Sequence, residues 1–353
     1  MTKFVQQLGS CLRSQRQMKT RTLIAIFAVA ILLASCTPRK RFVVYTASSD
    51  EKSVNLYLVE TDSGKNRQLT NVKYANYPDW SPDGKKIVFS SDDGLYFMSI
   101  NKADRTKIID TPKFEINSNW SPDGGKIAFI AQDVESRSSY DLMVVNSDGT
   151  GLITLASNLG DINYFYSFSW SPDGKKITFS SPVNESREIV TINTDGTGLT
   201  QVTNLSAPPN SPPIQPAWSP DGKKIAFVTW DLLVINADGT ELKKLLEKTE
   251  GISTFGMPQW SPDGKYIACH NGDNIVVINP INEETLIISG EYPLGSFSWS
   301  AQGDQLAYFI FNGSGNVSYG NLGMEKINIK TMQKVPLIKD LGFYPWQSLS
   351  WQP

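Results

Sequence analysis

Two residue types that carry much of enzyme chemistry are scarce in this chain of 353 residues: it has one histidine, His270, and three cysteines, Cys11, Cys36 and Cys269. A single histidine excludes a histidine-rich metal centre, and any histidine-based catalysis depends on His270 alone. Three scattered cysteines are too few for a disulfide framework. The G-x-S-x-G nucleophile elbow is also missing from the sequence. We therefore expect no catalytic residue, no metal site and no cofactor.

Acidic residues are missing from residues 1–41, which hold eight basic side chains. Residues 42–353 hold 25 basic and 35 acidic side chains. A region this acidic offers no positive surface for the phosphate backbone of a nucleic acid. Nucleic acid is therefore not expected as a partner.

Long apolar runs are scarce as well, and the run at Leu23–Leu33 has only 11 residues. It makes about 16 Å of helix, which is too short for a bilayer core of about 30 Å. Lys19 and Arg21 precede it and small residues follow, which is the layout of a secretory signal. The four residues that end it, Leu33-Ala34-Ser35-Cys36, resemble the lipobox of bacterial lipoproteins. An uncleaved membrane anchor and a buried helix are the alternatives.

The lipobox resemblance implies that residues 1–35 are a signal peptide and that Cys36 is acylated as the new N-terminus. Translation then starts at Met1 or Met18. Residues 36–41 become a short tether, whose basic residues add to membrane attachment. Thr37, and not aspartate, follows the cysteine, which implies the outer membrane in a host with two membranes. We expect a protein of the bacterial cell envelope that is held by lipid and faces the periplasm or the cell exterior.

A ten-residue motif dominates the rest of the chain. Five copies follow the pattern WSPDGKKIVF closely, a sixth reads WSAQGDQLAY, and the chain ends in SLSWQP. The tryptophans of these copies lie 39 to 52 residues apart. A motif that persists while its spacing drifts indicates one structural unit with loops of variable length. The tryptophans are Trp80, Trp120, Trp170, Trp218, Trp260, Trp299 and Trp351.

Each copy of the motif predicts a β-hairpin. In Ser-Pro-Asp-Gly, proline presets the second turn position and glycine supplies the left-handed residue that closes the turn. A third strand follows, such as DLMVVN at Asp141, and then a second turn, SDGT at Ser147, and a short fourth strand. Four antiparallel strands per repeat, without helical periodicity, are typical of a propeller blade.

The two ends of the repeat region determine the number of blades. Six complete units begin at the first six tryptophans, residues 42–70 supply strands two to four of another unit, and the last residues supply its first strand. Joining both ends makes a further blade and leaves no open edge in the ring. We predict an all-β fold, a seven-bladed β-propeller over residues 42–353 that is closed by the C-terminal strand, with six blades as the alternative.

The repeated decapeptide resembles the WD-like propeller repeat of the TolB type, and the resemblance covers nearly all of residues 42–353. It implies a propeller scaffold at the cell envelope. The protein that gives the family its name carries an α/β domain before a six-bladed propeller. Here only residues 36–41 separate Cys36 from the first predicted strand.

Residues that recur at one position of every unit are expected to be structural. The motif tryptophans can fill the wedge between adjacent blades, and the turn aspartates can bond their own backbone. Cys269 occupies a position that holds phenylalanine in four other units, so it predicts a buried apolar filler. His270 lies at a strand end and is expected to be a surface or packing residue.

The loops that join strands two to three and four to one vary in length and emerge on one face of the propeller. Function tends to lie on variable loops over a rigid frame, and aromatic residues are enriched in recognition sites. The face also carries Tyr74, Tyr77 and Phe114, and packing against the rim or the next blade is the alternative role. The predicted partner-binding residues are Tyr164, Phe165, Tyr166, Phe255, Tyr292, Tyr344 and Trp346.

The sequence thus predicts a non-enzymatic, lipid-anchored propeller of the cell envelope that binds a protein or peptide partner through its loop face. We expect a monomer. A receptor for carbohydrate or another small ligand is one alternative. A propeller-fold lyase or hydrolase that uses carboxylates and tyrosine is the other.

Overall fold

The chain divides into two compact units, Met1–Arg41 and Phe42–Pro353. In the first unit, a computed structural model describes Lys40 and Arg41, so the predicted signal peptide and Cys36 lie outside the described residues. The fold is that of the second unit. The structure describes residues 40–50, 53–102, 104–133, 140–160, 167–184, 186–205, 212–247, 255–272, 274–289, 296–311, 322–339 and 348–353.

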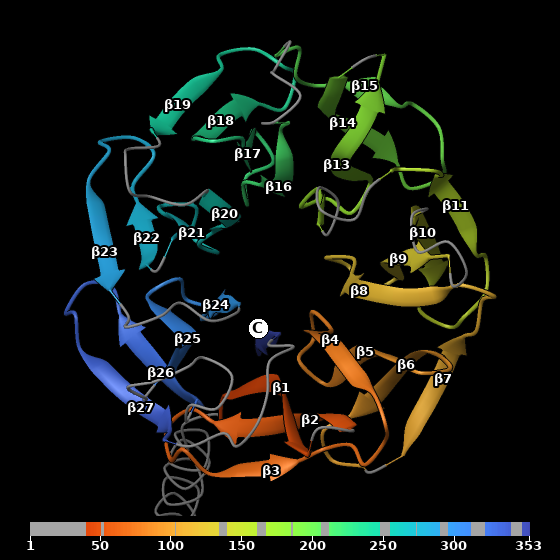
Figure 1. The fold of residues 1–353 in the computed structure, drawn as a ribbon, viewed down its shortest axis with the longest axis vertical. Helices are drawn as coiled ribbons and strands as arrows, with labels where there is room; N and C mark the ends of the chain where they lie inside the picture. Colours follow the sequence, from red (N-terminus) through yellow and green to blue (C-terminus); the bar gives the residue numbers. More distant parts are fainter. Residues whose placement is uncertain are drawn as a thin grey trace, which may run out of the picture. The chain divides into compact units, whose positions relative to one another are not determined.

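The second unit folds into seven four-stranded antiparallel sheets, which are arranged as blades around a central axis (Figure 1). All regular structure within the described ranges is β-strand. None of these residues forms a helix long and apolar enough to cross a bilayer. The predicted all-β, seven-bladed propeller is confirmed, and the six-bladed alternative is not favoured.

The blades are numbered along the chain, and their strands run from the innermost to the outermost. Blade 1 comprises β4 (Ala75–Trp80), β5 (Lys86–Ser91), β6 (Gly94–Ser99) and β7 (Arg105–Ile109). Blade 2 comprises β8 (Phe114–Trp120), β9 (Lys126–Gln132), β10 (Tyr140–Asn146) and β11 (Ile153–Ala156). Blade 3 comprises β12 (Phe168–Trp170), β13 (Lys176–Val183), β14 (Ser186–Asn193) and β15 (Thr200–Gln201).

The remaining blades follow the same order. Blade 4 comprises β16 (Ile214–Trp218), β17 (Lys224–Val228), β18 (Leu232–Asn236) and β19 (Lys243–Leu246). Blade 5 comprises β20 (Phe255–Trp260), β21 (Ile267–Asn271), β22 (Asn274–Ile278) and β23 (Thr285–Ser289). Blade 6 comprises β24 (Phe297–Trp299), β25 (Gln305–Phe311), β26 (Leu322–Asn328) and β27 (Lys334–Ile338). Blade 7 comprises β28 (Leu349–Trp351), β1 (Phe42–Asp50), β2 (Ser53–Glu60) and β3 (Asn66–Gln68).

The core lies between blades. The two middle strands of each blade have an adjacent blade on either side, so they read as continuous apolar runs instead of alternating. Between blades 7 and 1, for example, Val44 and Leu58 pack with Trp80 and Phe89 in one buried cluster. The outer strands differ: they are short, largely exposed and rich in polar residues, as in β3 and β15.

The Ser-Pro-Asp-Gly turn repeats one hydrogen-bond pattern. In blade 1 the Ser81 hydroxyl donates to Asp83 Oδ1 at 2.7 Å, and the Lys86 amide donates to Ser81 Oγ at 2.9 Å. Gly84 closes the turn at φ +66°, a backbone conformation that favours glycine. The repeated aspartates therefore bond within their own turns, as in Asp173, where the Ser171 hydroxyl lowers the pKa.

Every boundary between blades carries a hydrogen bond at the motif tryptophan. At four boundaries the indole N–H donates to the carbonyl of the residue before the tryptophan of the preceding blade, as from Trp80 to Ser350 at 3.0 Å. At the other three the tryptophan backbone N–H donates to the side chain at that same position, as from Trp120 to Asp79 Oδ2 at 2.9 Å. The indole donors are Trp80, Trp170, Trp260 and Trp299, and the backbone donors are Trp120, Trp218 and Trp351.

The ring is closed by β28, which pairs with β1. Val43 lies opposite Trp351, and Tyr45 lies opposite Leu349. Beyond the strand, Gln352 Nε2 donates to the carbonyl of Gly84 in blade 1 at 2.7 Å. Blade 7 is therefore built from both ends of the second unit.

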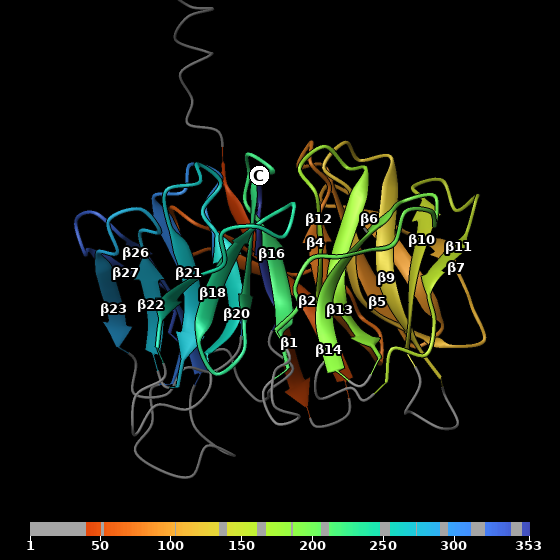
Figure 2. The same cartoon turned by 90° about the horizontal axis from the view of Figure 1, so that it is seen from above.

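The propeller has two faces (Figure 2). The short-turn face carries the turns that join the first strand of a blade to the second and the third to the fourth. The variable-loop face carries the connections from second to third strand and from one blade to the next. Because the strands of a blade are antiparallel, these two sets of connections lie at opposite ends of every sheet.

Deleting residues 348–353 removes β28 and leaves Val43 and Tyr45, which are now at most 1% exposed, beside an open strand edge. Burial of one such side chain contributes about 1.5–3 kcal/mol, so we expect a loss of several kcal/mol or failure to close the ring. Urea unfolding followed by near-ultraviolet circular dichroism measures this. Deletion of Pro353 alone, which is exposed, is the control, and equal midpoints for the two deletions would contradict the closure.

Asp79 makes the stability of the propeller depend on pH. Burial raises the pKa of this carboxyl to about 6, although it accepts hydrogen bonds from the Trp120 amide and the Ser350 hydroxyl. Between about pH 4 and 6 the Asp79 carboxyl is protonated in the folded state and ionised in the unfolded state. As pH rises through this range, ionisation of Asp79 therefore lowers the unfolding free energy, by up to about 3 kcal/mol. We expect Asp79→Asn to keep the acceptor and to gain stability relative to wild type as pH rises from 4 to 7.

The measurement is the unfolding free energy of both proteins across that pH range. Asp195→Asn is the opposite control, because hydrogen bonds from Thr197 lower the pKa of Asp195. Its contribution is present at neutral pH and lost on acidification. If the unfolding free energies of wild type and Asp79→Asn differed by the same amount at every pH, ionisation of Asp79 would not affect stability and the prediction would be wrong.

Candidate binding pocket

Most of the predicted partner-binding aromatics cannot be placed. Tyr164, Phe165, Tyr166, Tyr292, Tyr344 and Trp346 lie outside the described residues. Phe255 begins β20, and its side chain is outside the described part as well. Their role in binding therefore stays a prediction.

A pocket of about 410 Å³ opens on the variable-loop face between blades 1 and 2. Three segments form it: the turn between β5 and β6, the link between β7 and β8, and the end of β9 with Asp133, the residue that follows it. Its lining mixes carboxylates with one aromatic ring and several polar groups. The lining residues are Asp92, Asp93, Gly94, Asp110, Thr111, Pro112, Lys113, Phe114, Glu115, Gln132 and Asp133.

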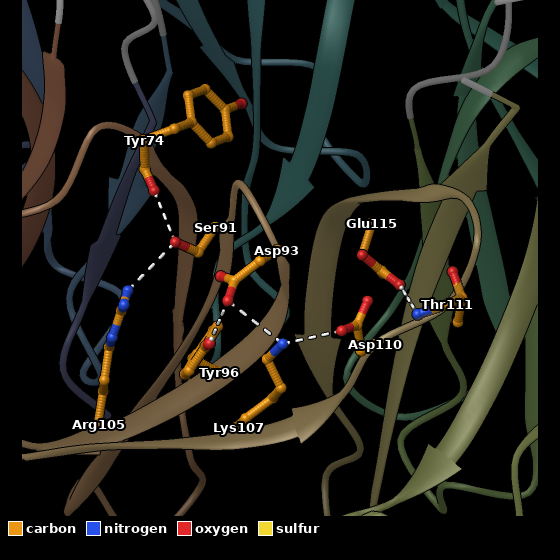
Figure 3. Close-up of polar contacts among 9 residues, drawn as sticks. All are labelled: Tyr74, Ser91, Asp93, Tyr96, Arg105, Lys107, Asp110, Thr111 and Glu115. Atoms are coloured by element: carbon orange, nitrogen blue, oxygen red, sulfur yellow. Dashed lines mark hydrogen bonds and ion pairs between the residues drawn. The ribbon is translucent and has the colours of Figure 1, made fainter. Parts of the chain in front are cut away.

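Lys107 of β7 lies at the centre of the polar contacts beside this pocket (Figure 3). Its Nζ is 2.9 Å from Asp110 Oδ2 and 3.2 Å from Asp93 Oδ2, and the Tyr96 hydroxyl donates to the same Asp93 oxygen at 2.9 Å. The hydrogen bond to Asp110 raises the pKa of Lys107. Burial disfavours the Asp93 charge, but bonds from Tyr96 and Lys107 outweigh it and lower the pKa of Asp93. Lys107 and Asp93 are therefore both charged at neutral pH.

Arg105 fixes the outer strand from the other side of the same tyrosine. Its guanidinium carbon lies 4.5 Å from the centroid of the Tyr96 ring, which is within cation–π range. Its Nη1 donates to Ser91 Oγ at 3.3 Å, and Ser91 donates in turn to the Tyr74 carbonyl at 2.8 Å (Figure 3). The contacts join the outer strand of blade 1 to the loop that leads into its inner strand.

Glu115 holds the link between the two blades. Its side chain is 1% exposed, and its Oε1 accepts the Thr111 amide at 2.8 Å. Burial raises the pKa of Glu115. Lys113, in the same link, bonds Asp141 of β10 at 2.6 Å. Asp92, by contrast, is exposed and makes no hydrogen bond or ion pair with the described part of the chain.

Two aromatic rings meet beside these carboxylates. The rings of Tyr74 and Phe114 lie 5.4 Å apart at 50°, and Phe114 lines the pocket. Both residues precede or begin the inner strand of their blade. The pocket can therefore offer an apolar surface and several acidic oxygens to one ligand group, which suits a cationic or polyhydroxylated group.

The sequence analysis predicted aromatic residues as the binding set and did not predict the carboxylates of this pocket. Asp92 and Asp93 lie in a connection from second to third strand, and Asp110 lies in a link between blades. The blade topology alone places both connections on the variable-loop face, so this signal was present. Trp230, which is 39% exposed in the turn between β17 and β18 on the same face, was missed as well.

The inner strands carry a second recurring feature. Four of them contain a bulge in which a residue other than glycine, three positions before the motif tryptophan, adopts φ between 50° and 54°. The Met257 amide donates to Gln215 Oε1 of the preceding blade at 2.6 Å. The bulges thus join neighbouring inner strands, and their residues are Tyr77, Asn117, Gln215 and Met257.

Cys269 and His270, the cysteine and histidine of the propeller, lie in packing environments. Cys269 is fully buried in an apolar cluster, where burial raises its pKa to about 12. The His270 ring lies 5.0 Å from the Phe297 ring. Among the residues that the structure describes, no group of three or more histidine, cysteine, aspartate or glutamate side chains is placed to hold a metal ion.

Comparison with solved structures identifies the same fold in proteins of different activity. TolB from Acinetobacter baumannii is 17% identical over 89% of this chain and 67% of its own, with a TM-score of 0.56. The periplasmic gluconolactonase of Pseudomonas aeruginosa is 16% identical over 89% of this chain and 99% of its own, with a TM-score of 0.63. Oligogalacturonate lyase from Vibrio parahaemolyticus is 14% identical over 78% of this chain and 89% of its own, with a TM-score of 0.58.

At such identities the likeness shows the fold, and the fold alone does not choose between binding and catalysis. No curated protein matches the sequence significantly. The family model described as TolB beta propeller domain (PD40) matches residues 16–205 and 125–273, which together exceed half of the chain. The blade motif, the closed ring of seven sheets and this match agree, and the chain belongs to the TolB beta propeller domain family.

Proposed function

We propose that this protein is a lipid-anchored, non-enzymatic propeller of the cell envelope that binds a protein or peptide partner through its variable-loop face. The observation that carries the proposal is the pocket between blades 1 and 2, where Phe114 lies among exposed carboxylates. An aromatic anchor point surrounded by polar groups is the composition of many recognition sites.

The charge of the pocket indicates a basic segment of the partner. Lys107 is engaged by Asp93 and Asp110, and Lys113 is engaged by Asp141. Neither lysine therefore neutralises Asp92 at the opening. A lysine or arginine side chain could lie against Phe114 and meet these carboxylates, which combines a cation–π contact with charge-assisted hydrogen bonds.

The envelope location rests on the lipobox resemblance at Leu33–Cys36 and on the basic residues that follow it. An acyl group on Cys36 together with Arg39–Arg41 would supply the two signals that stable membrane attachment needs. TolB, to whose propeller family the chain belongs, supports an envelope role by analogy.

Photocrosslinking from the pocket tests the partner. With Phe114→p-benzoylphenylalanine in intact cells, we expect a discrete protein adduct, and Ile287→p-benzoylphenylalanine on the outer strand β23 should give none. Asp92→Lys should reduce the adduct several-fold, because it places a positive charge beside a basic partner. Glu284→Lys, the same charge change in an exposed turn of the short-turn face, is the matched control.

Failure to obtain a pocket-specific adduct, or an equal effect of the two lysine variants, would contradict the proposal. A carbohydrate receptor is the second candidate, because the Tyr74 and Phe114 rings lie beside carboxylates as in many sugar sites. Saturable binding on a glycan array that Phe114→Ala abolishes would favour that candidate over a peptide-binding role.

A further inference from the structure

The position of Phe42 determines the face from which the preceding chain leaves the propeller. Phe42 begins β1, the second strand of blade 7, and pairs with Glu60, where β2 enters its turn toward β3. Its carbonyl also accepts the amide of Gln352, directly after the last inner strand. All three sites belong to the short-turn face, so the chain enters the propeller on that face.

The same face displays a repeated set of exposed apolar side chains. Eight large hydrophobic residues are exposed in the described part of the chain, and five of them lie in turns between the third and fourth strands. These five come from blades 2 to 6, one from each. They are Leu152, Leu199, Leu242, Ile281 and Met332, with exposures from 39% to 86%.

A single exposed leucine is ordinary, but one in the same turn of five consecutive blades forms an apolar arc. Between blades 4 and 5 the arc includes a hollow of about 660 Å³, to which Leu242 and Ile281 contribute together with Pro220, Pro262 and Trp260. Exposed apolar surfaces mark sites of contact with another protein, a ligand or a membrane.

Charges of both signs lie on the short-turn face. Exposed lysines follow the glycine of four Ser-Pro-Asp-Gly turns beside the turn aspartates, and Asp148, Asp195 and Asp238 lie in the turns of the arc itself. Lysine side chains beside apolar residues suit a headgroup region, where the stem is buried and the ammonium meets phosphate. These lysines are Lys85, Lys175, Lys223 and Lys265.

We infer that the short-turn face docks on the surface of the lipid bilayer, with the apolar arc at the headgroup boundary and the variable-loop face directed away from the membrane. This inference rests on the proposed acylation of Cys36. The chain from Cys36 to Phe42 spans at most about 20 Å, so the lipid would hold this face close to the bilayer. The pocket between blades 1 and 2 is then presented to partners on the far side.

Quenching by brominated lipid tests the orientation. The full chain, purified in its mature form from membranes, is placed in vesicles of phosphatidylethanolamine and phosphatidylglycerol with bromine on the acyl chains. A fluorophore on Leu199→Cys reports the short-turn face, and one on Pro182→Cys, exposed near the other end of the same blade, reports the variable-loop face. Cys269 is buried with a pKa of about 12 and does not compete for the label.

We expect several-fold stronger quenching of the label at position 199 than at position 182. Adding Leu152→Ser, Leu242→Ser and Ile281→Ser should reduce that quenching, and Ile287→Ser, an equally simple loss of an exposed apolar side chain on β23, should not. Equal quenching at the two positions would overturn the inference. So would protection of position 199 without quenching, because a protein would then cover the face.

Mass spectrometry of the same preparation separates the two proposals. If Cys36 carries no acyl group, the proposed anchor fails and the docking inference fails with it. If Cys36 is acylated and position 199 is not quenched, the anchor stands and the docking inference alone is wrong.

Discussion

The hydrogen bond between each motif tryptophan and the inner strand of the preceding blade is the contact on which the ring depends. One position, the residue before the tryptophan, accepts at all seven boundaries, through its carbonyl or its side chain. Because a blade cannot bury its two faces alone, it is stable only with a neighbour on each side. The tryptophan therefore combines apolar packing and a directional bond at the narrowest part of the ring.

The fold could be predicted from the sequence because its information is local and repeated. Ser-Pro-Asp-Gly determines a turn by its own chemistry, and six repetitions of the unit define the blade and its period. The closing blade followed from counting strands at both ends, and β28 pairs with β1 as expected. No long-range inference beyond strand order was needed.

The candidate site was harder to predict because its residues do not repeat. Asp92 lies in a connection within blade 1 and Asp110 in the link from blade 1 to blade 2, and their proximity depends on how these two connections approach each other. Attention to aromatic residues favoured segments such as Tyr164–Tyr166, which the structure does not describe. Loop topology indicates which residues share a face, but side-chain distances require coordinates. The acceptor side chain of Asp79, bridging three blades, is likewise invisible in a motif that varies at that position.

The outer strands have a consequence for solubility. Each blade ends in a strand with one unpaired edge, and such edges are templates for association between sheets. Here β15 has two residues and β3 has three, while β7, β19 and β27 carry lysines, with Pro336 also in β27. Shortness, like charges and a missing amide donor all oppose edge-to-edge polymerisation. Five of the seven open sheet margins are protected in this way, and β23, where Ile287 is 57% exposed, is the margin most open to association with another sheet.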